Sequence, residues 1–281
     1  MIFYRKMVPA DIQACMELSK AAGWNQLEID WQVFMRLGPE DNVVAVSGDD
    51  IVGSVATIRY GEELSWIGML LVHPDFRGRG VGKELLLEAV QKLAHEKNVK
   101  LDATSAGRQI YLQCGFEDEY PVSRLETHST AVAAPGQNCF PAEEKDLTAI
   151  FEMDAAVFGA DRQMLLKQVW FNALTFSYVY KSEGKISGYS LGRRGYRFFH
   201  IGPIIADNIE VAKNLLQTIL HFTPAGTPVI LDVNHTDREW LSWLNQSGFV
   251  EQRNFMRMFR GNNTSPGNPL RQYAILGPEF G

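Results

Sequence analysis

The spacing of hydrophobic positions changes several times along the chain, and each change predicts a switch between strand and helix. Apolar runs separated by turn residues such as Gly61 predict successive strands in the first half. Val81, Leu85 and Leu93 then recur at helical spacing, which predicts a long helix over 80–96. The strands predicted in this half are 2–6, 42–47, 51–60, 64–72, 99–103 and one from Phe116, and the helices are 10–22, 27–37, 80–96 and 107–113.

The second half of the chain repeats anchors of the first half in the same order. Ile67-Gly68 corresponds to Ile201-Gly202, and Leu101-Asp102 corresponds to Leu231-Asp232. Because the matches recur after about 130 residues, they predict two copies of one domain and not a solenoid of short repeats. The strands predicted in the second copy are 175–181, 186–193, 198–205, 228–233 and 249–259, and the helices are 143–157, 161–172, 208–221 and 236–246.

These patterns predict an α/β chain with two domains and a short linker. Residues 1–126 form the first predicted domain, and residues 138–281 form the second. Residues 127–137 between them are rich in Ser, Thr, Ala, Pro and Gly, a composition that favours a flexible connection.

Composition and charge exclude several classes of protein. The net charge of −6 and the pI near 5.6 argue against nucleic-acid binding, and no apolar run approaches the ~18 residues that predict a membrane span. Cys15, Cys114 and Cys139 lack the spacing of a metal site or a disulfide framework, so we expect no metal and a reducing, cytoplasmic location. We expect a monomer or a homodimer.

The most informative motif lies where a predicted strand meets the long helix. The strand ends at Val72, and Arg77-Gly-Arg-Gly-Val-Gly-Lys83 leads into the helix. Glycines let the backbone approach an anion closely, and the free N–H groups at a helix start point toward it. A dinucleotide-binding fingerprint would need glycine at Lys83, and a P-loop would need Ser or Thr at Glu84, so neither motif fits.

The remaining pattern, Arg-x-x-Gly-x-Gly at Arg77, Gly80 and Gly82, resembles the acetyl-CoA loop of the GNAT superfamily of N-acetyltransferases. Segment 101–116 also resembles a motif of that superfamily, with Tyr111 four residues before a Gly-Phe pair. The resemblance implies tandem GNAT folds, each with a mixed, mostly antiparallel sheet flanked by helices, and acetyl-CoA as the cosubstrate.

The second copy resembles the degenerate GNAT-like domain of some bacterial two-domain members. At the positions that correspond to the glycine-rich loop it has Val211, Asn214 and Leu216, inside a predicted helix without glycine. Leu244 stands where the first copy has its tyrosine. Only the first copy is therefore expected to bind acetyl-CoA.

The resemblance further implies roles for residues of the first copy. Strand 64–72 is expected to splay from strand 99–103, and the pantetheine arm would pair with backbone groups in the gap. Tyr111 would be the general acid that protonates the leaving thiolate. The residues expected to bind the cofactor are Leu70, Leu71, Val72, Arg77, Gly78, Arg79, Gly80, Val81, Gly82 and Lys83.

The sequence leaves the general base that frees the attacking amine open. Glu63 is taken as the catalytic candidate, because carboxylates near the fourth strand serve this purpose in many members of the superfamily. Glu62 and His73 are alternatives by position, and Asp30 is a more distant one.

The connection between the first two helices is expected to cover the acceptor. The candidate substrate-binding residues are Trp24, Asn25, Trp31 and Trp66, since aromatic and amide side chains suit a small polar amine. The alternative that Trp24 and Trp31 are core anchors is equally open. Arg193 and the basic residues around Gly195 are expected at a solvated hairpin tip.

Together these features predict an acetyl-CoA-dependent N-acetyltransferase that acts on a primary amine, of a small molecule, by direct attack in a ternary complex. The second copy would wall one side of the acceptor cleft. Two alternatives remain open: acetylation of a protein lysine or N-terminus, and a non-catalytic acetyl-CoA sensor.

Overall fold

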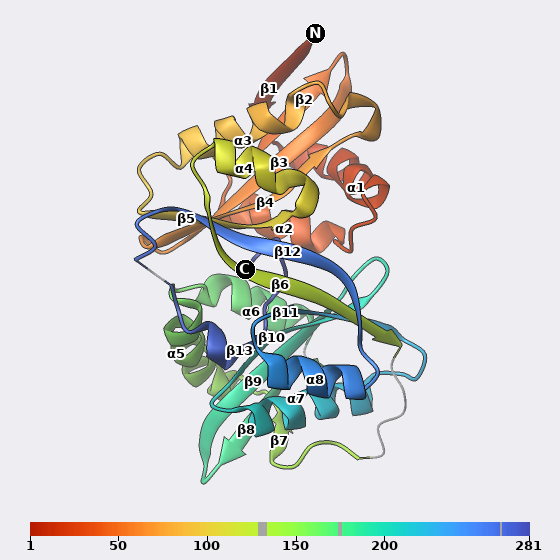
Figure 1. The fold of residues 1–281 in the computed structure, drawn as a ribbon, viewed down its shortest axis with the longest axis vertical. Coiled ribbons are helices and arrows are strands. Elements are labelled where there is room, and N and C mark those ends of the chain that lie inside the picture. The colour runs from red at the N-terminus through yellow and green to blue at the C-terminus, as the bar shows by residue number, and fades with distance from the viewer. Residues whose placement is uncertain (129–133, 174–175, 265) are drawn as a thin grey trace.

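Two similar halves share one continuous sheet in the computed structural model (Figure 1). The structure describes residues 1–128, 134–173, 176–264 and 266–281. Part of the predicted linker 127–137 lies outside the described residues.

The elements of the first half follow the predicted order. They are β1 (Ile2–Lys6), α1 (Ile12–Ala21), α2 (Glu28–Leu37), β2 (Val43–Ser47), β3 (Asp50–Tyr60), β4 (Leu64–Val72), α3 (Val81–Lys92), β5 (Asn98–Thr104), α4 (Ser105–Gln113) and β6 (Glu117–His128). The predicted helix 80–96 is too long at its C-terminal end, because Leu93 has left helical geometry and caps α3.

The second half repeats this order, with β7 pairing with β8 as β1 pairs with β2, and it adds β13 near its end. The sequence analysis predicted neither β7 nor β13. Its elements are β7 (Cys139–Pro141), α5 (Leu147–Phe158), α6 (Gln163–Asn172), β8 (Tyr178–Ser182), β9 (Lys185–Arg194), β10 (Phe199–Ala206), α7 (Ile209–Phe222), β11 (Pro228–Asn234), α8 (Arg238–Gln246), β12 (Val250–Gly261) and β13 (Gln272–Ala274).

The two halves exchange strands at the centre of the sheet. The strand order is β1-β2-β3-β4-β5-β12-β6-β11-β10-β9-β8-β7, and β13 pairs with β10. The last long strand of the second half, β12, thus lies between β5 and β6, as Figure 1 shows. In return, β6 pairs with β11. Each half therefore contributes a strand to the sheet of the other.

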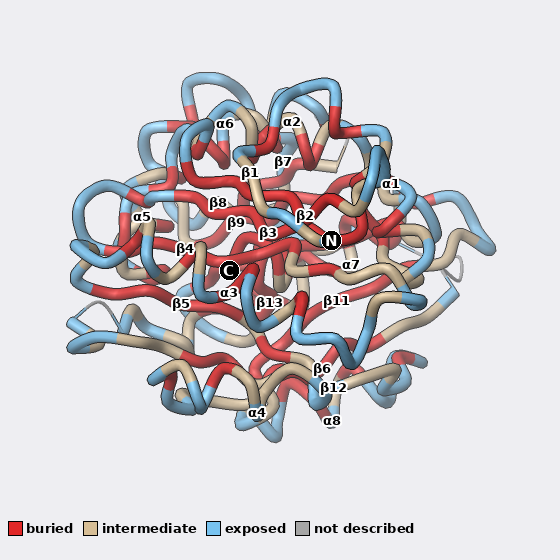
Figure 2. The backbone as a smooth tube through the Cα atoms, turned by 90° about the horizontal axis from the view of Figure 1, so that it is seen from above, coloured by how far each residue is buried: buried red, intermediate tan, exposed pale blue. Residues whose placement is uncertain are grey.

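Helices cover both faces of the sheet, and alternate side chains of each strand enter different cores. On β2, Val44 and Val46 join a buried cluster with α1, α2, α5 and α6, which spans both halves. Val43 and Ala45 point to the opposite face, where α3 and α4 pack, and α7 and α8 cover the second half of that face. Figure 2 shows these helix layers on either side of the buried strands.

Strands β4 and β5 part after only two residue pairs. Ser65 pairs with Val99 and Trp66 with Lys100, and beyond them the two parallel strands are no longer paired. The splay that the GNAT resemblance implied is therefore confirmed.

The corresponding strands of the second half part in the same way. There β10 and β11 also pair at only two positions. In this copy, however, β13 occupies the gap and pairs with Ile204 and Ile205 of β10.

Two reciprocal ion pairs join the exchanged strands. Arg124 on β6 forms a bidentate pair with Asp232 on β11, at 2.7 and 2.8 Å. Arg257 on β12 forms the matching pair with Asp102 on β5, at 2.9 Å for both contacts. The four side chains are almost completely buried. Each arginine lies directly opposite its aspartate across the exchange, so the two pairs fix both the partner and the register.

We predict that Arg257→Ala lowers the free energy of unfolding by about 3–5 kcal/mol, because it leaves the Asp102 carboxylate buried and unpaired. Urea unfolding of the full chain, followed by circular dichroism, measures the change. Arg260→Ala on the same strand is the control and should cost no more than about 0.5 kcal/mol. Equal losses in the two variants would contradict a specific role for the pair.

Candidate active site

The glycine-rich loop lies at the start of α3 with its backbone amides free of a capping side chain. Gly80 is the N-cap residue, with a φ of 83°, and no side chain caps this helix end. A side chain on Gly78 or Gly80 would meet no atom within 4 Å, so the backbone is approachable from outside. These free amides, with Arg77, Arg79 and Lys83 beside them in the chain, fit the diphosphate of acetyl-CoA.

The strand that leads to this loop has an unpaired edge along the splay. After Trp66, no strand among the described residues pairs with β4 on the β5 side, although β3 still pairs with its other edge. The ladder with β3 is irregular between Gly68 and Leu71, and Met69 adopts a φ of 53° within this bulge. The edge around Leu70, Leu71 and Val72 can therefore pair with an extended arm such as pantetheine.

A pocket of about 620 Å³, including its open mouth, lies at the splay. Its lining comes from β4, β5, α4 and the α1–α2 connection of the first half. Arg253 and Phe255 of β12, together with Pro278 and Glu279 of the C-terminal tail, complete it. The second half thus supplies part of the pocket wall.

Tyr111 lines this pocket from α4. Its side chain is buried and stands edge-to-face against Phe116, with ring centroids 6.1 Å apart. A side chain at Gly107 would come within 2.9 Å of the tyrosine ring, so this glycine makes room for it. Burial raises the pKa of Tyr111, which keeps its hydroxyl protonated.

The structure does not bring Glu63 to the pocket. Its carboxylate forms an exposed ion pair with Lys97 at 2.6 Å, just before β4 begins. Glu62 is likewise exposed and is absent from the pocket lining. His73 lies at the other end of β4, where its Nδ1 accepts a hydrogen bond from the Asp75 amide.

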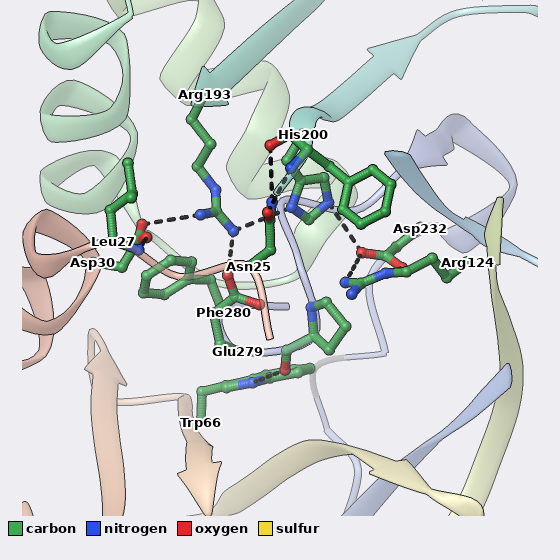
Figure 3. A network of polar contacts seen from close by, with 12 residues as sticks. Asn25, Leu27, Asp30, Trp66, Arg124, Arg193, His200, Asp232, Glu279 and Phe280 are labelled. Atoms are coloured by element: carbon green, nitrogen blue, oxygen red, sulfur yellow. Dashed lines mark hydrogen bonds and ion pairs between the residues drawn. The ribbon is translucent and has the colours of Figure 1, made fainter. Parts of the chain in front are cut away.

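Asp30 is buried between the two halves and does not line the pocket (Figure 3). It accepts hydrogen bonds from the Leu27 amide at 2.7 Å and from Arg193 Nη1 at 3.0 Å. Burial raises its pKa to about 6, although the Arg193 guanidinium opposes this shift. Its contacts make it part of the interface between the halves.

Of the four candidate substrate-binding residues, only Trp24 lines the pocket. Trp31 is fully buried in the core shared by both halves. Trp66 is also buried, donates to the Pro278 carbonyl at 3.0 Å and has the Arg257 guanidinium over its ring. Asn25 binds the backbone of the opposite hairpin and accepts a hydrogen bond from the Phe198 amide at 2.9 Å.

The expectation that Arg193 lies at a solvated hairpin tip is wrong. Its side chain is buried and contacts Asp30, Glu279 and His200 (Figure 3). The sequence could not show this, because the two carboxylates come from distant segments. Its neighbours Arg194 and Arg197 are exposed as expected.

The pocket contains two carboxylates that the sequence analysis did not assign to the site. Asp102 is held by Arg257, and Glu279 by Arg193. Burial raises the pKa of Asp102 despite its partner. Burial also acts to raise the pKa of Glu279, but Arg193 and other cations outweigh it and the pKa is lowered. The repeat of Leu-Asp at 101–102 was the available signal for Asp102, although it revealed no role.

The second half lacks both the uncapped helix start and the open strand edge of the first half. Val211, Asn214 and Leu216 lie within α7, and the Asn208 side chain caps this helix by accepting from the Val211 amide. In the repeat, Ile204 and Ile205 correspond to Leu70 and Leu71 on the open edge of β4, and here they pair with β13. The chain's own tail therefore occupies the second gap.

The described residues contain no group of His, Cys, Asp and Glu side chains that could hold a metal ion. None of the helices within the described residues is long and apolar enough to cross a membrane.

Comparison with known proteins agrees with this geometry. Two family models described as acetyltransferase (GNAT) domain match residues 39–118 and 150–274, which together make up well over half of the chain. Holothin acyltransferase from Pseudoalteromonas sp. (strain SANK 73390) is 29% identical over 96% of this chain and 91% of its own length. The uncharacterized N-acetyltransferase YitH of Bacillus subtilis (strain 168) is 25% identical over 76% of each chain.

A solved structure from Pyrococcus horikoshii, assigned as an acetyltransferase, has the same fold. It superposes with a TM-score of 0.85 over 100% of this chain and 96% of that chain, at 21% identity. The chain belongs to the GNAT superfamily as a tandem GNAT protein, and it is an N-acetyltransferase that uses acetyl-CoA.

Proposed function

We propose that this enzyme transfers the acetyl group of acetyl-CoA to the primary amine of a small molecule, by direct attack in a ternary complex within the pocket at the splay. The observation that carries this proposal is the position of Tyr111 in a pocket that opens where β4 and β5 part. Bound acetyl-CoA supplies an activated acetyl thioester.

The first half would hold this cosubstrate along one continuous path. Free amides at the start of α3 would receive the diphosphate, and the unpaired edge of β4 would pair with the pantetheine arm. The residues on this path are Leu70, Leu71, Val72, Arg77, Gly78, Arg79, Gly80, Val81, Gly82 and Lys83. Backbone N–H groups at the bulge of β4 would then polarise the reacting carbonyl.

Tyr111 would act as the general acid for the departing thiolate. Its hydroxyl is protonated at neutral pH, as an ordinary phenol is, and burial raises its pKa further. A phenol is a weaker acid than a thiol, so the proton transfer has to accompany cleavage of the carbon–sulfur bond.

The attacking amine must be neutral, and no free carboxylate among the described pocket residues is placed to deprotonate it. Asp102 and Glu279 are both held by arginines, and Glu63 is paired with Lys97 at the surface. We therefore assign no role in catalysis to Glu63. The amine would lose its proton to water at the open mouth of the pocket.

A small molecule fits this pocket better than a protein chain. The C-terminal tail and β12 form its far wall, and the tail backbone passes so close to Gly68 that a side chain there would meet the Glu279 carbonyl at 2.6 Å. A protein lysine or N-terminus would need an open groove. The presence of Tyr111 beside the loop also argues for an enzyme over a non-catalytic sensor.

We predict one acetyl-CoA site for each chain, abolished by Gly80→Glu. The new side chain would be strained at a φ of 83° and would place a carboxylate where the diphosphate binds. Calorimetry with CoA measures both stoichiometry and affinity. Gly226→Glu is the matched control, because Gly226 has a φ of 80° and equal open space but lies in the turn before β11. Two equivalent sites, or unchanged affinity in Gly80→Glu, would refute this.

We predict that Tyr111→Phe lowers kcat by about 10²–10⁴-fold and leaves the Kd for CoA nearly unchanged, because a positioned proton transfer acts mainly in the transition state. The assay follows release of free thiol from acetyl-CoA with a panel of amines, and mass spectrometry identifies the acetylated product. Tyr196→Phe, at an exposed tyrosine, serves as the control. Wild-type turnover in Tyr111→Phe would leave the tyrosine with a structural role only.

A further inference from the structure

One arginine of the pocket has no partner for its charge. Arg253 lies on β12 and lines the pocket together with Trp24 and Gln26. No described residue forms a hydrogen bond or an ion pair with its guanidinium, which is only partly exposed. The other arginine of the pocket, Arg124, is neutralised by Asp232.

The surroundings of Arg253 make an unpaired charge there unfavourable. In the register of the sheet it stands directly opposite Arg124, and like charges in such cross-strand pairs repel. Burial lowers the pKa of Arg253, and the nearby Arg124 and Arg197 lower it further. Asp232 and Glu126 oppose this effect without forming an ion pair with it. An anion bound from solution would relieve the repulsion.

We infer that the acceptor carries a carboxylate in addition to its amine, and that Arg253 binds this carboxylate and so determines acceptor specificity. The inference rests on the proposed function, since it names the chemistry of the small molecule acetylated in the same pocket. A guanidinium presents parallel N–H groups that match the two oxygens of a carboxylate.

The cosubstrate does not provide this anion. Its phosphates would lie at Arg77–Lys83, past the C-terminal end of β4. Arg253 comes from the other half of the chain, on a strand separated from β4 by β5. The two cationic regions therefore serve different molecules.

The pocket also offers a polar group for the amine. Gln26 is buried, and its Oε1 has no hydrogen-bond partner among the described residues. A buried amide oxygen without a partner is unfavourable, and an N–H of the acceptor would satisfy it. Gln26 for the amine and Arg253 for the acid would orient an amino acid, whereas a simple amine would leave the guanidinium unpaired.

The test compares acids with their amides as acceptors. Glycine, β-alanine and leucine are assayed beside glycinamide, β-alaninamide and leucinamide, and O-phosphoethanolamine shows whether a phosphate can replace the carboxylate. We expect the acids to exceed the amides at least about tenfold in kcat/KM, mainly through KM, because a hydrogen bond to a charged group is lost. A preference for the phosphate over every carboxylate would overturn the choice of carboxylate.

Substitutions test whether Arg253 is responsible for the preference for acids over amides. Arg253→Gln should remove the discrimination between acid and amide, and Arg253→Lys should retain part of it because the charge remains. Arg238→Gln removes the same charge from an exposed position on α8 and should leave the discrimination intact. Full discrimination in Arg253→Gln, or amides that match the acids in the wild type, would overturn the inference.

Binding measurements separate this inference from the proposed function. Calorimetry of the CoA-loaded protein should show that acids bind and amides do not, with the difference lost in Arg253→Gln. If acids bind in this way but no thiol is released, the carboxylate site stands and the proposed acetyl transfer fails. If amides are acetylated and acids neither bind nor react, the transfer stands and the carboxylate site fails.

Discussion

The architecture depends on two buried arginine–aspartate pairs that cross the exchange of strands. Arg124 reaches Asp232 and Arg257 reaches Asp102, so each half holds an ion whose counter-ion belongs to the other half. An alternative pairing of β6 or β12 would leave charges buried without partners, which is far more costly than losing apolar contacts. The pairs therefore specify the exchange, and through it they bring Arg253 on β12 into the pocket beside β4 and β5.

Each half contains an equivalent pair of splayed strands, and the gap between the strands differs in the two halves. In the first half, the gap beyond Trp66 remains open next to a helix whose N-terminal amides are uncapped. In the second half, β13 fills the equivalent gap and Asn208 caps the helix. Filling the second gap anchors the C-terminal tail, and the tail then runs to Gly68 in the first half. The segment that fills the second gap thus leads into a wall of the pocket at the first gap.

Local features of this fold could be predicted from the sequence, whereas its long-range pairing could not. Periodicity and glycine placement gave the order of elements and the loop at Arg77–Lys83, and the GNAT resemblance gave the splay. The position of β12 between β5 and β6 was not predicted, because hydrophobic alternation shows which face of a strand is buried but not which strand it pairs with. Arg193 looks like a surface residue in the sequence, and Asp102 shows no role there, since burial of a charge depends on a partner far away in the chain. Trp31 and Trp66 could not be distinguished from pocket residues either, because an aromatic side chain suits a buried core as well as a binding pocket.

The exchange also assigns cofactor binding and acceptor binding to different halves in the proposed function, whereas a single domain would have to achieve both with its own residues. In the proposed function, contacts with acetyl-CoA would come from β4 and α3 of the first half, through the bulge and the free amides. The acceptor side is closed by β12 and the tail, which belong to the second half and carry no part of the cofactor path. Substitutions there can alter which amine is admitted without disturbing the thioester. If Arg253 binds the acceptor as inferred, its place on β12 puts selectivity on a strand that takes no part in the proposed cofactor contacts.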